Sequence, residues 1–245
     1  MCRHLAYVGT RAPIGELLVD APHGLVAQAH TPRWQTSGKD NPDGYGVAWW
    51  TDDDGTPRRH RSTTCIWHDP LLSRVAGHRT EAVVAAARLA SPGSPVDVTG
   101  NAPFISGRYA WSLNGVVDGW HDGVGDELRA QVTPEHRAWI EGVTDGEALF
   151  ALALDSLDRG APLEDALTDV IGAVEARTTG RLNIVLCDGH RVAASARGNS
   201  LFVRRADASC LVASEPLDDD ERWERVPDGT LVLGDAAGLV ASTGL

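Results

Sequence analysis

The sequence predicts an α+β fold in which two β-sheets carry helices on their outer faces. Short apolar runs bounded by turn residues fill the first half of the 245 residues and return after Gly180. The segment between these two regions has apolar residues at helical spacing. Strands, then helices, then strands again are typical of sheets with helices packed outside them. We expect a single domain over residues 1–245, which is long enough to bury a substantial core.

The first half is expected to form strands that end at turns rich in Gly, Pro, Asp and Asn. A dense group of such residues at 41–46 leads directly into one of these strands. The most apolar run, 82–90, has the nearly continuous hydrophobic character of a strand that is covered on both faces. The strands expected here are residues 2–8, 47–50, 82–90 and 109–117.

The middle of the chain is expected to form helices, and the end of the chain to form strands. In the segment 145–158 four apolar residues share one helical face, and Thr144 or Asp145 can cap that helix. The expected helices are residues 126–140, 145–158 and 163–177. The expected strands that follow are residues 182–187, 192–196, 201–205, 210–213 and 230–233.

Charge and composition exclude several kinds of partner and site. The formal net charge of −12 at pH 7 repels phosphate backbones, so no nucleic-acid partner is expected. The sequence has neither an apolar run of membrane-spanning length nor a secretion signal, which predicts a cytoplasmic protein without membrane contact. The nine histidines and four cysteines form no metal-ligand spacing and no CxxC pair, so we expect reduced thiols, no metal and no cofactor.

Cys2 is the leading candidate for a nucleophile. Met1 is the only methionine of the chain, and the small residue after it permits its removal, which leaves a free amine on Cys2. An α-amino group with a pKa of roughly 7.7–8.0 can accept the proton of a thiol whose pKa is about 8.5, so no histidine is needed. The alternative is a small buried apolar residue at the start of an edge strand, and position alone favours this alternative.

Several further segments resemble the class II glutamine amidotransferase domains of the N-terminal-nucleophile hydrolases, in the same order along nearly the whole chain. This resemblance implies a four-layer αββα sandwich with two mainly antiparallel sheets. It also implies an amidohydrolase whose nucleophile is Cys2, and it identifies residues 1–245 as a single domain of this type. The segments are residues 1–5, 41–47, 87–91, 101–104, 113–117, 144–147 and 214–216.

The resemblance implies that Asn114 and Gly115 form the oxyanion hole. An amide attacked by a thiolate develops negative charge on its carbonyl oxygen, which preorganised donors stabilise. Asn114 offers a side-chain NH₂ group, and Gly115 offers an unobstructed backbone N–H group at the end of a strand. The alternative is a hairpin turn, which is the commonest meaning of Asn-Gly between apolar runs.

Arg88 and Asp145 are implied to hold the glutamyl part of the substrate. Arg88 lies in an apolar segment, where a guanidinium needs a carboxylate partner. The resemblance makes this partner the α-carboxylate of a γ-glutamyl group, and Asp145 would hold the α-ammonium of the same group. An internal acidic partner for Arg88 and a plain helix cap at Asp145 are the alternatives. We expect residues 41–46 to shape a loop near the site without contributing a catalytic atom.

A finer resemblance is to the γ-glutamyl hercynylcysteine S-oxide hydrolases of ergothioneine biosynthesis, and it is carried by residues 1–5, 57–62, 181–185, 204–207 and 213–220. It implies a small γ-glutamyl cysteine conjugate, bearing a trimethylated histidine, as the substrate. A glutaminase subunit that delivers ammonia to a separate synthetase is the second hypothesis, and a catalytically dead binding module is the third. The sequence does not indicate an oligomeric state.

Tryptophan and aspartate side chains are the candidates for binding the trimethylammonium end of such a substrate. A quaternary ammonium is best bound by aromatic faces and carboxylates. Packing in the core or at its rim is the alternative for each tryptophan. One departure from the family is that Leu113 stands where relatives often have histidine before Asn-Gly. The candidates for the distal contact are Trp34, Trp49, Trp50, Trp67, Trp111, Trp120, Asp118 and Asp122.

Overall fold

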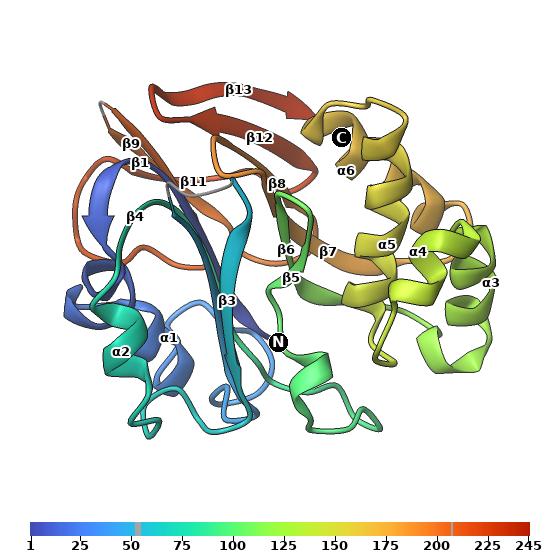
Figure 1. Ribbon diagram of the computed structural model, residues 1–245, viewed down its shortest axis with the longest axis horizontal. Coiled ribbons are helices and arrows are strands. Elements are labelled where there is room, and N and C mark those ends of the chain that lie inside the picture. Colours follow the sequence, from blue (N-terminus) through green and yellow to red (C-terminus); the bar gives the residue numbers. More distant parts are fainter. Residues whose placement is uncertain (52–54, 207) are drawn as a thin grey trace.

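A computed structural model, which describes residues 1–51, 55–206 and 208–245, confirms the α+β fold. Two antiparallel sheets lie face to face, and helices cover the outer face of each, which gives the four layers αββα (Figure 1). Helices α1 and α2 lie on one side of this sandwich and helices α3 to α6 on the other.

The first sheet has seven strands in the order β11-β9-β10-β1-β4-β2-β3. All of its neighbouring strands are antiparallel. Strand β1 lies in the middle, so the segment that follows Cys2 is hydrogen-bonded on both sides and is not an edge strand. The strands are β1 (Arg3–Pro13), β2 (Tyr45–Trp50), β3 (Pro57–Ser62), β4 (Arg79–Ala87), β9 (Phe202–Ala206), β10 (Ser209–Ala213) and β11 (Trp223–Arg225).

The second sheet has six strands in the order β13-β12-β8-β7-β6-β5, again antiparallel throughout. Strand β5 is much shorter than β6 and pairs only with the first three residues of β6. The rest of β6 therefore has no strand neighbour on that side. The strands are β5 (Phe104–Ser106), β6 (Tyr109–Val117), β7 (Gly180–Cys187), β8 (Arg191–Ala196), β12 (Thr230–Asp235) and β13 (Gly238–Gly244).

The helices on the first sheet are short, whereas the second sheet carries the two longest helices of the described structure. The π-helical turn η1 (Glu16–Asp20), α1 (Leu25–His30) and α2 (Leu72–Ala76) cover the first sheet. The second sheet is covered by α3 (Val124–Gln131), α4 (Pro134–Trp139), α5 (Asp145–Asp158) and α6 (Leu163–Glu175). Two 3₁₀ turns, η2 (Val98–Gly100) and η3 (Trp120–Asp122), lie in connecting segments.

Three apolar layers fill the spaces between the four structural layers. The alternation of side chains along β1 shows how they are divided. Leu5 and Tyr7 pack with α1 on the outer face, whereas Ala6 and Val8 face the second sheet. The third layer joins β6 and β7 to α5 and α6. Side chains at even positions of β1 therefore point toward the second sheet, and this places the side chain of Cys2.

Two expectations from the sequence are wrong in detail. The helix expected over 126–140 is interrupted, because Thr133 caps a new helix with Pro134 at its first position. The strand expected over 82–90 ends at Ala87, so Arg88 lies just after β4 rather than within it. The short helix α2 and the strands β3 and β11, which have few apolar residues, were not expected.

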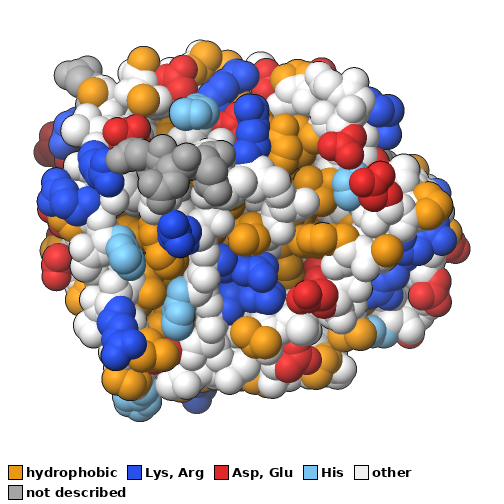
Figure 2. Space-filling model, viewed as in Figure 1, with side chains coloured by type: hydrophobic (Ala, Val, Ile, Leu, Met, Phe, Trp, Pro, Cys, Tyr) orange, Lys and Arg blue, Asp and Glu red, His pale blue; other side chains and the backbone are white. Residues whose placement is uncertain are grey.

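No helix within the described residues is long and apolar enough to cross a membrane. Figure 2 shows basic side chains gathered near the middle of one face, with acidic side chains close beside them.

Candidate active site

The side chain of Cys2 faces the second sheet at the rim of the sandwich. His4, two residues along, points the same way, and its Nδ1 lies 3.3 Å from Oγ of Ser112 on β6. Ser214 ties this region together, because its Oγ accepts hydrogen bonds from the backbone N–H of His4 at 3.0 Å and from Nδ2 of Asn114 at 3.2 Å. The hydroxyl of Ser214 therefore links Asn114 on β6 to His4 near the start of β1.

The backbone at Cys2 is held by a buried ion pair. Nε of Arg3 donates to the carbonyl oxygen of Cys2 at 2.7 Å, and its Nη1 donates to Oε1 of Glu215 at 2.8 Å. The side chains of Arg3 and Glu215 are wholly buried. Glu215 also accepts the backbone N–H groups of Arg33 and Trp34. The nucleophile candidate thus begins a rigidly anchored strand.

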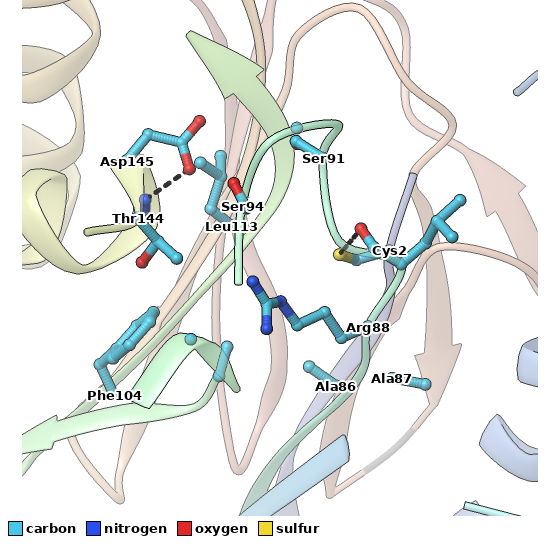
Figure 3. A pocket seen from close by; sticks show the side chains of 15 residues that line it. Cys2, Ala86, Ala87, Arg88, Ser91, Ser94, Phe104, Leu113, Thr144 and Asp145 are labelled. Carbon is cyan, nitrogen blue, oxygen red and sulfur yellow. Dashed lines mark hydrogen bonds between the residues drawn. The ribbon is translucent and has the colours of Figure 1, made fainter. Parts of the chain in front are cut away.

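A pocket opens beside Cys2, and Figure 3 shows Arg88 reaching into it between Cys2 and Asp145. Four of the five site residues expected from the sequence line this pocket: Cys2, Arg88, Gly115 and Asp145. The remaining lining residues are Ala86, Ala87, Leu89, Ser91, Ser94, Gly100, Ala102, Phe104, Leu113, Thr144 and Gly146.

Gly115 presents backbone to the pocket at the open edge of β6. The N–H of Val117 donates to Oδ2 of Asp145 rather than to β7, so it points toward this edge. Successive N–H groups of a strand point to alternate sides, so the N–H of Gly115 points the same way. A Cβ atom at Gly115 would lie 1.7 Å from the carbonyl oxygen of Arg181, which excludes any side chain there.

Asn114 lies inside the protein directly next to the pocket and is not one of its lining residues. It is wholly buried within β6, so the hairpin-turn alternative for Asn114 and Gly115 is wrong. Its Nδ2 carries two hydrogens, and the bond to Ser214 leaves one of them available. Its Oδ1 has no hydrogen-bond partner within the described residues.

Arg88 is a buried cation that forms no ion pair within the described part of the chain. Its backbone is fixed by a hydrogen bond from its N–H to the carbonyl oxygen of Gly44 at 2.8 Å. Its side chain is 7% exposed, and its polar contact is a long one of 3.5 Å to Oδ1 of Asn101. A Cβ atom at Gly100 would lie 2.7 Å from the guanidinium, so the backbone of η2 packs directly on it. The internal-carboxylate alternative is therefore not what the structure shows.

Asp145 lies at the first position of α5 and faces the pocket. Its Oδ2 accepts the N–H of Val117 at 3.0 Å, and its Oδ1 accepts the N–H of Gly146 at 2.8 Å. Burial raises the pKa of Asp145, although these backbone hydrogen bonds act in the opposite direction. Each carboxylate oxygen has two lone pairs, so it can still accept a hydrogen bond from a bound ammonium group. Thr144 is the capping position, but its side chain makes no capping hydrogen bond.

The histidine nearest to Cys2 in the sequence cannot act as a base toward it at neutral pH. His4 is wholly buried, and burial together with the charge of Arg3 lowers its pKa to about 3. Its imidazole stays neutral and contacts Ser112. This arrangement leaves the proton of the Cys2 thiol to a group other than His4.

A second hollow adjoins the pocket and shares Ser91, Ser94 and Asp145 with it. Its other lining residues include Asp118, Trp120 and Asp122. The ring of Trp120 is largely buried, with Arg129 over it at 4.7 Å. None of the other five tryptophan candidates lines either hollow, and among them Trp49, Trp50 and Trp111 are buried in the apolar layers.

The four cysteines are all free thiols. Burial raises the pKa of Cys187, and raises that of Cys210 to about 12, so neither is a reactive thiolate. Cys65 is half-buried away from the pocket. Within the described residues, no group of three His, Cys, Asp or Glu side chains is placed to hold a metal ion.

Three residues that support the site were not singled out by sequence reasoning. Ser214 orients Asn114, Glu215 anchors Arg3, and Asn41 contacts Met1. All three lie in segments that carried the family resemblance, which was the available signal. Their contacts span 40 to 212 residues along the chain, so the sequence did not indicate their partners.

Comparison with known proteins agrees with the fold described above. The model of the family "Glutamine amidotransferases class-II" matches residues 28–209. A γ-glutamyl-hercynylcysteine sulfoxide hydrolase from Mycolicibacterium smegmatis is 34% identical over 95% of each chain. One from Mycobacterium tuberculosis is 38% identical over 95% of this chain and 92% of its own. A solved class-II glutamine aminotransferase domain protein from Silicibacter pomeroyi superposes with a TM-score of 0.72 at 25% identity, covering 100% of this chain and 99% of its own. This chain belongs to the family of class-II glutamine amidotransferases.

Proposed function

We propose that this chain is an amidohydrolase that releases glutamate from γ-glutamyl-hercynylcysteine S-oxide, leaving hercynylcysteine S-oxide, in ergothioneine biosynthesis. The 34–38% identity to hydrolases of that name over 95% of the chain supports the substrate. The observation that carries the reaction is the pocket itself, which combines a thiol, a carboxylate and a buried arginine that has no ion pair among the described residues. This combination suits an amino-acid head group linked to an amide.

Cys2 is the nucleophile in this proposal, after removal of Met1. Its thiol proton passes to its own α-amine while sulfur attacks the γ-carbonyl carbon. The oxyanion that forms is stabilised by the N–H of Gly115 and the remaining N–H of Asn114. Collapse breaks the C–N bond, the α-ammonium returns the proton to the departing amine, and a thioester remains. Water then attacks the thioester and releases glutamate and the thiol.

Arg88 and Asp145 hold the glutamyl group in this proposal. The guanidinium of Arg88 takes the α-carboxylate, since it lies buried in the pocket and no described residue forms an ion pair with it. Asp145 takes the α-ammonium of the same group. Its carboxylate lies across the pocket from Cys2, beyond the guanidinium of Arg88 (Figure 3). The reaction needs no metal or cofactor, because every proton transfer uses the thiol and the amine of Cys2.

The setting proposed for this enzyme is the cytoplasm, where a reduced thiol persists. The proposed partner is the small γ-glutamyl conjugate alone, and residues 1–245 act as a single domain. Free thiols at all four cysteines and the absence of a membrane-spanning helix in the described residues are consistent with this setting.

Replacement of Arg88 by alanine is expected to lower kcat/KM for the γ-glutamyl substrate by roughly 10²- to 10³-fold. Losing one partner of a buried, hydrogen-bonded charge pair costs about 2–5 kcal/mol of binding. Arg88→Lys should recover only part of the loss, because an ammonium lacks the planar fork that pairs with a carboxylate. Steady-state kinetics check this. An Arg88→Ala variant with the wild-type KM would show that Arg88 does not bind the glutamyl group.

The affinity for substrate is expected to fall as the pH is lowered. Burial raises the pKa of Asp145, so its carboxyl group protonates at a higher pH than an ordinary aspartate. Protonation removes the charge that holds the α-ammonium, so KM should rise as the pH falls. In Asp145→Asn the KM should be high at neutral pH already and lack this rise. An Asp145→Asn profile that parallels the wild type would assign the effect to another group.

The substrate itself is tested by comparing kcat/KM for γ-glutamyl-hercynylcysteine S-oxide with kcat/KM for free glutamine. We expect a strong preference for the conjugate. A preference for glutamine, increased by a partner synthetase, would favour the second hypothesis, an ammonia-supplying glutaminase subunit. A purified protein that retains Met1 and hydrolyses neither compound would favour a binding module.

A further inference from the structure

We propose that the side chain of Asn41 positions the α-amino group of Cys2, so that the amine presents its lone pair to the thiol. This role rests on the N-terminal-nucleophile reaction proposed above and adds a positioning residue to it. The amine is the only base in that reaction, and a primary amine on a freely rotating chain end needs a partner to fix its orientation.

Asn41 reaches the peptide bond whose cleavage creates this amine. Its Nδ2 donates a hydrogen bond to the carbonyl oxygen of Met1. The carbonyl carbon of Met1 is bonded both to this oxygen and to the nitrogen of Cys2. The acceptor of this hydrogen bond is therefore only two covalent bonds away from the atom that becomes the amine.

While Met1 is present, only the Nδ2 atom of the Asn41 amide has a hydrogen-bond partner in the described structure. The residue is wholly buried, yet its Oδ1 has no hydrogen-bond partner in the described structure. A buried acceptor without a partner costs about 1–3 kcal/mol, so such an atom needs an explanation. Removal of Met1 also removes the acceptor for Nδ2, and the whole amide then faces a vacated space next to Cys2.

A free α-amine complements this amide. When neutral, it has two hydrogens to donate and one lone pair. Donation of one hydrogen to Oδ1 of Asn41 satisfies the orphaned acceptor and leaves the lone pair for the proton of the thiol. The neutral side chain of asparagine suits this task, because an anion at the same place would favour the ammonium form, which cannot accept that proton.

The segment that carries Asn41 is fixed to the rest of the site. The N–H of Asn41 donates to the carbonyl oxygen of Ala29 at 2.7 Å. Asp43, two residues later, donates its N–H to the carbonyl oxygen of Arg88 at 3.0 Å and accepts the N–H of Ala90 at 2.8 Å. Sγ of Cys2 lies 3.7 Å from the carbonyl oxygen of Leu89. One scaffold thus supports Asn41, Arg88 and the thiol.

Other charged groups also act on this terminus, and they must stay constant in the test. The terminal amine in the structure is that of Met1, and burial is the largest effect that lowers its pKa. Arg3 on β1 and Arg181 on β7 act in the same direction, whereas the thiol of Cys2 and Asp43 in the loop oppose it. After removal of Met1 the amine of Cys2, one residue along the chain, is expected to experience the same groups. Substitution of Asn41 changes none of these groups. A shift in the titration of the amine can therefore be assigned to position 41.

The test measures how the rate of labelling of Cys2 by 6-diazo-5-oxo-L-norleucine depends on pH. This glutamine-mimicking electrophile reports the thiol and amine pair whatever the natural leaving group is. Wild type, Asn41→Asp and Asn41→Ala are made as fusions that a protease cuts directly before Cys2, so that every protein begins with the free amine. We expect Asn41→Asp to shift the rising limb of the rate–pH profile to higher pH by about one unit. Asn41→Ala should label roughly 10- to 100-fold more slowly at neutral pH.

Gln28→Ala is the matched control. Gln28 is a buried amide that bonds to the carbonyl oxygens of His23 and Glu215 without contacting Met1 or Cys2. This variant should lose stability but keep the wild-type pH limb. Folded Asn41 variants with the wild-type limb, or an equal shift in Gln28→Ala, would overturn the role of Asn41. A wild-type protein that is not labelled at Cys2 would instead overturn the proposed function.

Discussion

Replacement of Cys2 by alanine is expected to lower kcat/KM for the γ-glutamyl substrate by a factor on the order of 10⁴ or more, as loss of the nucleophile does in other covalent hydrolases. The change removes the attacking sulfur and leaves the glutamyl clamp of Arg88 and Asp145 in place. Substrate should therefore still bind without turnover. Kinetics together with calorimetric titration of the conjugate into the variant check both parts of this expectation.

Cys65→Ala is the matched control for this experiment, because Cys65 is half-buried but lies away from the pocket. It should retain wild-type activity. In the wild-type protein, a glutamine-mimicking electrophile should add once, at Cys2. Hydrolysis by the Cys2→Ala protein, or an adduct mapped to Cys65, would exclude the N-terminal-nucleophile reaction.

The elements with the strongest patterns were predictable from the sequence. The segment expected as a helix over 145–158 is α5, and that expected as a strand over 109–117 is β6. Both are long, and their apolar residues recur at one clear period. Thr133 followed by Pro134 at the start of α4 is a typical helix start, but the apolar spacing continues across this break and therefore predicts one helix.

Other elements owe their structure to partners that are distant in the sequence. Strand β3 has almost no apolar side chains, and pairing with β2 makes it a strand. Its residues carry no pattern of period two for the sequence to reveal. The short helix α2 likewise depends on packing Leu72 and Val75 against the first sheet, and five residues are too few to show a helical period.

Within the candidate site, the reacting groups were predictable from chemistry, but their supports were not. A thiol at position 2, an Asn-Gly pair and an arginine in an apolar segment each suggested a role. Ser214 and Glu215 form the contacts that hold Asn114 and Arg3 across 100 and 212 residues of sequence. Such pairings are a property of the folded sandwich, because β10 lies beside β1 and brings the segment after it to the N-terminus.

Replacement of Glu215 by glutamine is expected to lower the free energy of unfolding by about 3–5 kcal/mol. The variant keeps the shape of the side chain but leaves the guanidinium of Arg3 buried without a counter-charge. Burial lowers the pKa of Arg3, and the charge and hydrogen bond of Glu215 oppose this effect, so the cation depends on this one carboxylate. Urea denaturation of the variant and the wild type measures the difference.

Glu175→Gln provides the comparison, since Glu175 forms an ion pair with Arg197 in which both side chains are about two-fifths exposed. Exposed pairs contribute roughly 0–1 kcal/mol, so this variant should remain close to wild type. Equal losses in the two variants would contradict the importance of burial at Glu215.

Removing both charges separates the stability of the anchor from its function. When neither charge remains, no uncompensated ion is buried, and the double variant Arg3→Met with Glu215→Gln should recover more than half of the stability that Glu215→Gln loses. Its activity should stay low, because methionine cannot donate to the carbonyl oxygen of Cys2 as Nε of Arg3 does. A double variant that recovers both stability and activity would show that the ion pair stabilises the fold without orienting the nucleophile. Recovery of stability alone would show that the pair holds Cys2 in its reactive position.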